Sequence, residues 1–293
     1  MDQTKSEIVS NGIRHVVHRF RCPDLEREGA RRVLLLHGFL DAGSTWDLVA
    51  GPLARAGYDV HAPDLRGFGA SGRVPLGGYY HFADYIADVD GLVNAITANS
   101  PGWLAVVGHS MGGTIASLWA GIRPERVAKL AILEGLGPPV EGADQGVHRM
   151  RQWLRDLDRI ERSPRPMESI EQATKKLAAT HPKIDLALLR TRAERLVTED
   201  ASGRIVWAHD PLHRTHSPTP FQADVFMTFL RSITCPTLYA NAGESGWRTP
   251  DEAERVACLR DARTVTLEGA GHMMHWSAPV ELAEALLSFF AAD

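Results

Sequence analysis

Ser110 stands in the surroundings that most strongly favour nucleophilic chemistry in this sequence. The segment GHSMG, residues 108–112, follows the apolar run WLAVV and opens a predicted helix. In this strand–turn–helix motif the turn is so tight that a side chain at either glycine would collide with it, and the strained serine stands clear of the sheet. A serine hydroxyl becomes a nucleophile when a base takes its proton. The motif therefore predicts Ser110 as the nucleophile of an acyl-transfer reaction.

A general base for this serine is expected near the end of the chain, because an acid and then a histidine follow the serine in this motif. The segment GAGH, residues 269–272, comes after the last predicted strand and before the final predicted helix. We therefore predict His272 as the base. His275 is its rival, but we expect it on the following turn, beside Trp276.

Two backbone N–H groups must also stabilise the negative oxygen that forms during acyl transfer. One is the amide that follows the nucleophile, in Met111. The loop after the predicted strand 32–37 reads HGF and is expected to supply the other, which we assign to Phe39. We expect His37 to be a loop histidine that hydrogen-bonds its neighbours, because this chemistry needs the amides and not the imidazole.

Short apolar runs alternate with longer amphipathic stretches, a pattern typical of a parallel sheet covered by helices. Runs such as VLLL and LAVV are almost continuously hydrophobic, as in strands that are buried on both faces. We expect strands at residues 13–21, 32–37, 58–62, 103–108, 127–133, 237–241 and 263–267, and helices at residues 45–56, 81–98, 111–122, 250–259 and 278–291.

This alternation is interrupted between two proline-rich segments, GPP at residue 137 and SPTP at residue 217. The residues between them show a mostly helical pattern, after which the chain returns to the sheet. We therefore predict a core formed by residues 1–136 and 221–293, with residues 137–220 inserted as a helical cap. Such a cap would lie over the carboxyl ends of the strands, where open α/β sheets bind their ligands.

Several aromatic residues in or near the insertion are candidates for substrate binding, although aromatic residues at helical spacing more often belong to a core. These candidates are Trp153, Trp207 and residues 209–211 (HDP) in the insertion, and Tyr79, Tyr80 and His81 near a loop of the core.

The composition argues against several classes of partner. The 32 basic and 36 acidic residues give a net charge of −4, and no basic patch predicts nucleic-acid binding. No apolar run approaches the roughly 18 residues of a membrane span, and the polar N-terminal segment is unlike a signal peptide. We therefore expect a cytoplasmic protein that acts on a small molecule, with no membrane partner.

The cysteines and histidines do not indicate a metal site. The three cysteines have no metal-ligand spacing, so we expect buried, reduced thiols. His209 and His213 have the spacing of a helical metal pair, but Pro211 lies between them and would disrupt the helix. The sequence therefore predicts no zinc ion.

Four motifs occur in the order known from one family. HGF (residues 37–39), DLRGFGAS (64–71), GHSMGG (108–113) and GAGH (269–272) resemble the motifs of α/β-hydrolases. The resemblance spans the chain outside the insertion. Further segments, LEGLGPP, GGYYHFADY and PTLYANAGESGW, are similar to the serum hydrolase-like branch of serine hydrolases. The resemblance implies the α/β-hydrolase fold and a Ser–His–acid triad that needs no metal or organic cofactor, while the loop at residues 64–71 is structural.

The acid of the triad is where this chain departs from the common pattern. Most relatives carry an aspartate shortly after the strand that matches residues 237–241, but here Ser245 occupies that position and Glu244 precedes it. Some members, including certain haloalkane dehalogenases, instead place the acid after the preceding strand, where this chain has Glu134. We therefore favour Glu134 as the acid and keep Glu244 as the alternative.

The predicted activity is hydrolysis of an ester-type bond in a small, largely apolar substrate through an acyl-enzyme. A serine at position 110 argues against epoxide hydrolase and haloalkane dehalogenase chemistry, which this fold performs with an aspartate. Cleavage of a lactone, a thioester or a carbon–carbon bond by the same triad remains an alternative. A receptor-like protein with slow turnover is another, and hydroxynitrile lyase chemistry is a weaker one. The sequence does not indicate the oligomeric state.

Overall fold

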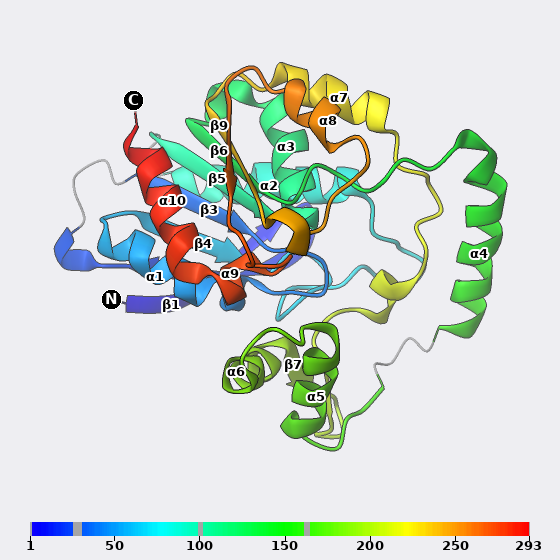
Figure 1. Ribbon diagram of the computed structural model, residues 1–293. Helices are drawn as coiled ribbons and strands as arrows, with labels where there is room; N and C mark the ends of the chain where they lie inside the picture. Colours follow the sequence, from blue (N-terminus) through cyan, green and yellow to red (C-terminus); the bar gives the residue numbers. More distant parts are fainter. Residues whose placement is uncertain (1, 26–30, 99–101, 161–164, 293) are drawn as a thin grey trace.

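The structure is a computed structural model that describes residues 2–25, 31–98, 102–160 and 165–292. Its strands form an eight-stranded sheet in the order β1-β2-β4-β3-β5-β6-β9-β10, with helices on both faces (Figure 1). The strands are β1 (Asp2–Ser10), β2 (Ile13–Arg21), β3 (Arg32–Leu36), β4 (Asp59–Pro63), β5 (Leu104–His109), β6 (Lys129–Leu133), β9 (Thr237–Asn241) and β10 (Ala262–Thr266). Strand β2 pairs antiparallel with β1 and β4, and the other pairs are parallel. The mostly parallel α/β sheet predicted from the sequence is confirmed.

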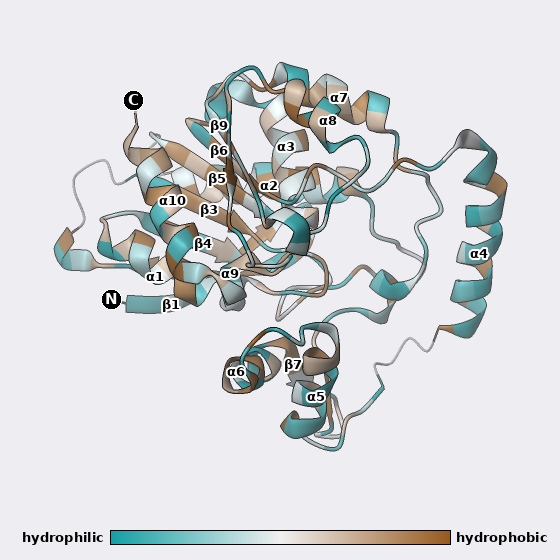
Figure 2. Cartoon of the chain, viewed as in Figure 1, coloured by the Kyte–Doolittle hydropathy of each residue, from teal (hydrophilic) through white to brown (hydrophobic). Residues whose placement is uncertain are grey.

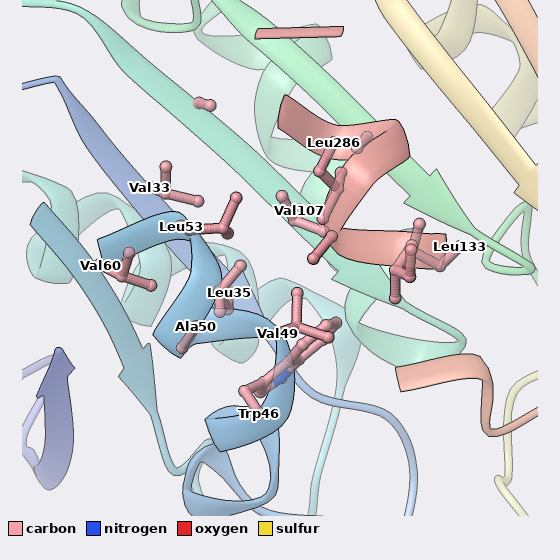
Figure 3. Packing of buried hydrophobic residues seen from close by; sticks show 14 of the residues in the cluster. Val33, Leu35, Trp46, Val49, Ala50, Leu53, Val60, Val107, Leu133 and Leu286 are labelled. Atoms are coloured by element: carbon pink, nitrogen blue, oxygen red, sulfur yellow. The ribbon is translucent and has the colours of Figure 1, made fainter. Parts of the chain in front are cut away.

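Helices cover both faces of the inner strands, which explains why these strands are apolar along their whole length. Successive side chains of a strand point to opposite faces. Leu35 therefore packs on one side with α1 (Asp47–Arg55) and α10 (Pro279–Ala291), and Figure 3 shows it near Val49 and Leu53. Leu34 and Leu36 pack on the other side with α2 (Phe82–Thr97), α3 (Met111–Ile122) and α7 (Ala223–Ser232).

Two elements of the core were not predicted from the sequence. Strand β1 is almost entirely exposed, so its side chains show no apolar alternation. It pairs with β2 through a tight turn in which Asn11 and Gly12 have φ angles of 47° and 73°, as expected for an Asn-Gly hairpin. Helix α7 buries Phe226 and Leu230 in the same cluster as α3, but it lies just after the proline-rich segment and was not recognised.

The described part of residues 137–220, the predicted insertion, contains three α-helices and a two-stranded sheet. These elements are α4 (Gly146–Arg159), α5 (Ile170–Thr180), α6 (Leu186–Leu196), β7 (Val197–Glu199) and β8 (Ile205–Trp207). Figure 1 shows α4 set apart from the sheet, with α5, α6 and β7 grouped together. Figure 2 shows that α4 is largely hydrophilic, in contrast to the inner strands.

The second half of the insertion is attached to the core by both apolar and ionic contacts. Leu189 and Leu196 of α6 pack with Ala42 and Trp276 of the core. Arg192, which is fully buried, forms an ion pair with Asp47 at 2.6 Å. Helix α4, in contrast, has no buried residue. The two halves of the insertion are therefore held to the core to very different degrees.

The cysteines and the helix lengths bear on two of the expectations from the sequence. All three cysteines are free, but only Cys235 is buried, whereas Cys22 and Cys258 are half-buried. The expectation of three buried thiols is therefore wrong for the latter two. Among the described residues, no helix is long and apolar enough to cross a membrane.

Candidate active site

Ser110 lies at the sharp turn between β5 and α3, and its φ angle of 51° is unusual for a residue with a side chain. Glycines make this turn possible. A Cβ atom at Gly108 would lie 2.6 Å from the Cα atom of Gly113, and one at Gly112 would lie 2.6 Å from the carbonyl oxygen of His37. Larger residues there would force the backbone to move, which explains the two glycines of the motif.

Ser110, His272 and Glu134 form one chain of hydrogen bonds. The Nε2 atom of His272 lies 3.0 Å from the Ser110 Oγ atom, and its Nδ1 atom lies 2.7 Å from Oε2 of Glu134. Because a carboxylate only accepts hydrogen bonds, the Nδ1 atom carries the proton and Nε2 is left to accept one from the serine hydroxyl. This is the arrangement that general-base activation of a serine requires.

The carboxylate of Glu134 is buried and held by further donors. Glu134 directly follows β6, has a φ angle of 46° and is 1% exposed. Its Oε1 atom accepts a hydrogen bond from the Ala242 N–H at 2.8 Å, and Oε2 accepts one from the Trp247 N–H at 2.9 Å. A Cβ atom at Gly246 would collide with Oε1. Glycine at this position leaves room for the carboxylate, a constraint that the sequence did not reveal.

The alternative acid lies elsewhere. Glu244 is exposed in a short 3₁₀ helix, Gly243–Ser245, and its side chain makes no hydrogen bond or ion pair with any described residue. Ser245, which occupies the position of the usual aspartate, donates a hydrogen bond to the Ala242 carbonyl and accepts one from the Gly271 N–H. Ser245 thus joins the loop that carries Glu244 to the loop that carries His272.

The loop after β3 brings the predicted amide donors to the same region. His37 is buried, donates from Nδ1 to the Gly38 carbonyl at 2.8 Å and accepts at Nε2 from the Leu65 N–H at 2.9 Å. Burial lowers the pKa of His37, so the ring stays neutral, as suits a loop histidine that bonds its neighbours. The Phe39 N–H donates to no described group. The Met111 N–H lies in the first turn of α3, where amides lack intrahelical partners.

A second carboxylate–imidazole pair, which the sequence did not predict, lies close to His109 and His272. His275, in α9 (Met274–Ser277), donates from Nε2 to Oδ2 of Asp41 at 2.9 Å, and both side chains are buried. His109 donates from Nε2 to the backbone carbonyl of His272 at 2.8 Å. The Nδ1 atoms of His109 and His275 are buried and have no partner among the described residues. His275 lies in the turn after His272 with its ring 5.7 Å from that of Trp276, and it is bonded to Asp41 rather than to Ser110.

Asp41, His109 and His275 form a group that could hold a metal ion, as judged from the described residues. One ligand atom from each of Asp41, His109 and His275 lies within 4.8 Å of the others. Two imidazoles and a carboxylate suit zinc and similar ions. The three residues are far apart in the sequence, so ligand spacing gave no signal. His213, which we considered for a zinc pair, instead stacks between Phe68 and Tyr80, at 3.9 Å from each ring.

The predicted substrate-binding residues lie around two different cavities. Tyr79, Tyr80 and His81 line a cavity of about 650 Å³, the apolar cavity, together with Phe39 and Met111. Trp207 and His209 line a separate cavity of about 480 Å³. Trp153 lines neither, and its ring packs edge-on against Tyr79. The aromatic candidates therefore do not form one site.

The sheet order and the strained turn at Ser110 place the chain among α/β proteins that carry a nucleophile between a strand and a helix. The model of the alpha/beta hydrolase fold family matches residues 31–279, so the chain belongs to the α/β-hydrolase family. This confirms the resemblance seen in the four sequence motifs.

The comparisons with individual proteins agree with this family. The chain is 27% identical over 271 residues to a serine hydrolase-like protein of Danio rerio, which covers 88% of this chain and 81% of that protein. It is also 27% identical to a probable serine hydrolase of Drosophila melanogaster, over 88% of this chain and 80% of that protein. A solved thioesterase domain from the curacin biosynthetic pathway superposes with a TM-score of 0.84 at 25% identity, covering 98% of this chain and 100% of that domain. The protein is therefore a hydrolase.

Proposed function

We propose that the protein is a serine hydrolase that cleaves an ester-type bond through an acyl-enzyme. Ser110 is the nucleophile, His272 is the general base and Glu134 is the acid of the triad. The observation that carries this proposal is the continuous chain of hydrogen bonds from the Ser110 Oγ atom through His272 to Glu134. Serine at position 110 also argues against the aspartate-based reactions of epoxide hydrolases within the same fold.

The proposed reaction has two halves. The Ser110 Oγ atom attacks the carbonyl carbon while His272 Nε2 takes the hydroxyl proton, which gives a tetrahedral intermediate. When the bond to the leaving group breaks, His272 returns this proton to the leaving group. Water then attacks the acyl-enzyme, with His272 again accepting and returning a proton. No step requires a metal or an organic cofactor.

The backbone amides of Phe39 and Met111 are proposed to stabilise the negative oxygen of the tetrahedral intermediate. Preorganised N–H groups at such a position contribute on the order of 3–4 kcal/mol each to transition-state stabilisation. Both residues line the apolar cavity, and the Phe39 N–H has no competing acceptor among the described residues. A carbonyl bound at Ser110 would therefore meet free donors.

Glu134 is proposed as the acid in preference to Glu244 because of its burial and its three donors. A buried carboxylate that accepts hydrogen bonds from two backbone amides and an imidazole is held in one orientation. It fixes the tautomer of His272 and stabilises the imidazolium that forms after proton transfer. The exposed side chain of Glu244 has no such contact.

The apolar cavity supports a substrate that is largely apolar. Apart from Phe39 and Met111, its wall includes Phe82, Leu118 and Phe226. Residues 137–220 are proposed to act as a cap over this cavity, since Pro138, Pro139 and Pro220 at the ends of the insertion also line it. Cap loops of this kind control which substrates reach the nucleophile.

Thioester cleavage is the second candidate, because the same triad attacks a thioester carbonyl. The similarity to a thioesterase domain over nearly the whole of both chains favours it over cleavage of a lactone or a carbon–carbon bond. A receptor-like protein differs from both enzymes in stalling after one turnover, whereas an enzyme releases many product molecules for each active site.

The proposal is tested by replacing the nucleophile. Ser110→Ala should lower kcat on a p-nitrophenyl ester by about 10⁶, as expected when the nucleophile of a triad is removed. It should also abolish labelling by a fluorophosphonate. Ser288→Ala, at an exposed position of α10, is the matched control and should behave as the wild type. Labelling that persists in the Ser110 variant would show that the nucleophile is another residue.

A further inference from the structure

The second cavity lies within the insertion and is strongly basic, and we call it the cationic cavity. It has a volume of about 480 Å³ and is bounded by the end of α4, by α5, by β8 and by the short helix Pro211–Arg214. The charged residues of its lining are Arg159, Arg165, Lys176, Arg214 and Asp156. A concave surface with such an excess of positive charge concentrates anions.

The single carboxylate of the cavity is already occupied by other donors. Asp156 accepts hydrogen bonds from the His216 N–H at 2.9 Å and from the His216 Nδ1 atom at 2.7 Å, and another from Gln152 at 2.9 Å. These hydrogen bonds lower the pKa of Asp156, so the group stays ionised and turned toward its own partners. It offsets one positive charge of the lining, so that Arg159, Lys176 and Arg214 leave the cavity with a net positive charge.

Several arginines of the insertion that lie outside the cavity are paired with carboxylates. Arg149, Arg190 and Arg204 pair with Glu141, Glu171 and Asp200 respectively. In contrast, Arg159, Lys176 and Arg214 form no ion pair with any described residue. Cations that outnumber the carboxylate beside them repel one another, and an anion bound between them would relieve this repulsion.

One wall of the cationic cavity is aromatic and neutral. The rings of Trp207 and His209 lie nearly parallel, with centroids 6.3 Å apart and an interplanar angle of 21°. Burial and then the charge of Arg214 lower the pKa of His209 to about 4, so its ring is uncharged at neutral pH. A planar aromatic group could rest against this wall while its phosphates meet the cations, which is the combination that a nucleotide presents.

The cationic cavity adjoins the apolar cavity. Thr215 lines both of them, and its Oγ1 atom lies 2.6 Å from the hydroxyl of Tyr79, another residue of the apolar cavity. The apolar cavity in turn is lined by Phe39 and Met111, whose amides are the proposed donors to the substrate oxygen. An elongated substrate with its carbonyl at Ser110 would have to pass Thr215 to place its charged end in the cationic cavity.

From these contacts we propose that the cationic cavity binds the phosphates of a nucleotide-linked thiol, and that the substrate is an acyl thioester of this thiol. The inference rests on the proposed function and specifies its substrate. Ser110 forms an ester bond with the acyl carbon, the carbon–sulfur bond breaks, and the sulfur leaves as a thiol with the proton from His272. Water then releases the acid, so that thioester and water give acid and thiol.

Three octanoyl thioesters with the same acyl group test this inference. Octanoyl-coenzyme A carries the nucleotide and its phosphates, octanoyl-phosphopantetheine carries one phosphate, and octanoyl-N-acetylcysteamine carries none. We expect kcat/KM to fall in this order, by about a hundredfold in all, because hydrogen bonds to charged groups each change affinity by roughly ten- to a hundredfold. High salt should reduce the preference for coenzyme A.

Variants of the cavity test which residues produce the preference. The double variant Lys176→Gln, Arg214→Gln should raise KM for octanoyl-coenzyme A about tenfold or more, with little change in kcat, and should lower its kcat/KM relative to octanoyl-N-acetylcysteamine. Trp207→Leu should lower kcat/KM for octanoyl-coenzyme A more than kcat/KM for octanoyl-phosphopantetheine. Arg190→Gln, another exposed arginine of the insertion that lies outside the cavity, is the matched control and should keep the wild-type ratio.

Direct binding gives a readout that does not depend on turnover. Free coenzyme A should bind to the Ser110→Ala protein in titration calorimetry and bind at least tenfold more weakly after the Lys176 and Arg214 changes. Equal kcat/KM for the three thioesters, or a ratio that the double variant does not change, would overturn the inference. Esterase activity that depends on Ser110 would then leave the proposed function standing. If the wild type hydrolysed neither thioesters nor p-nitrophenyl esters, both proposals would fail.

Discussion

Two carboxylate–imidazole pairs lie close together in this protein, and their differences explain why we propose a catalytic role for only one of them. In each pair the two atoms are at hydrogen-bond distance, 2.7 Å for His272 and Glu134 and 2.9 Å for His275 and Asp41. Both carboxylates are almost fully buried. The imidazoles differ, because the side chain of His272 is 33% exposed and meets a serine hydroxyl, whereas His275 has no exposed surface. A bonded carboxylate alone therefore does not make a histidine a catalytic base.

The buried pair has the features of a structural element. Burial lowers the pKa of His275 even though Asp41 bonds to it, so the ring stays neutral. Burial opposes the ionisation of Asp41, but the interactions with His275, His37 and Thr45 together outweigh it, and the pKa of Asp41 is lowered. His275 packs against the ring of Trp46 at 4.6 Å and lies 4.7 Å from His109, which bonds the backbone of His272. This layer supports the loop that carries the proposed base.

The largest effect within this comparison is expected when the pair of His272 and Glu134 is broken. Glu134→Gln should lower kcat by roughly 10²–10⁴ with little change in KM, because the amide no longer fixes the tautomer of His272. In one orientation of the amide, the new NH₂ group would face the N–H of Ala242. In the other orientation, it would face the N–H groups of Trp247 and His272. Steady-state kinetics on a p-nitrophenyl ester measures the loss, and circular dichroism checks that the variant is folded.

The opposite result for the two pairs would contradict this interpretation. If Glu134→Gln kept near wild-type kcat while a change at Asp41 or His275 abolished it, the buried pair would be the one that takes part in catalysis. Retention of fluorophosphonate labelling in folded Glu134→Gln, at a reduced rate, would support the view that Ser110 remains in place and only its activation is impaired.

A smaller effect on activity is expected when the buried pair is broken. His275→Ala should lower kcat by less than about tenfold, since His275 is buried and bonds Asp41 rather than Ser110. It should lower the free energy of unfolding by about 2–4 kcal/mol, because the change removes a buried ring and leaves Asp41 without its imidazole donor. Urea denaturation and kinetics well below the melting temperature separate the two effects. An inactive but stable His275 variant would mean that the roles of His272 and His275 are reversed.

The sequence predicted the pair of His272 and Glu134 but not the pair of His275 and Asp41, for a physical reason. Ser110 and His272 stand in local motifs whose glycines are required by the turn, so short segments are sufficient to identify them. Asp41 and His275 come together only through the fold, and no local pattern marks their contact. The same holds for β1, whose exposed side chains show no alternation, and for the cationic cavity, whose residues come from separate elements.

Glu134 is an intermediate case. Its position at the end of a predicted strand suggested a role, but the sequence offered Glu244 with similar spacing. The choice between them depends on which carboxylate points toward His272, and this is determined by the φ angle of 46° at Glu134 and by the space beside Gly246. Neither feature has a sequence signature that distinguishes it from an ordinary loop.

The smallest effect is therefore expected at Glu244, which belongs to neither pair. Its side chain is exposed and makes no hydrogen bond or ion pair with any described residue. Glu244→Gln removes one charge from an exposed turn, where substitutions usually change stability by less than about 0.5 kcal/mol. We expect kcat to fall by well under tenfold and the unfolding midpoint in urea to stay at its wild-type value. Glu244→Gln and Glu134→Gln each replace one carboxylate oxygen by an NH₂ group, so each variant serves as the control for the other. A strong loss of kcat at Glu244, with Glu134→Gln near wild type, would return the acid to the position that most α/β-hydrolases use. Two equally mild losses would mean that neither carboxylate alone orients His272.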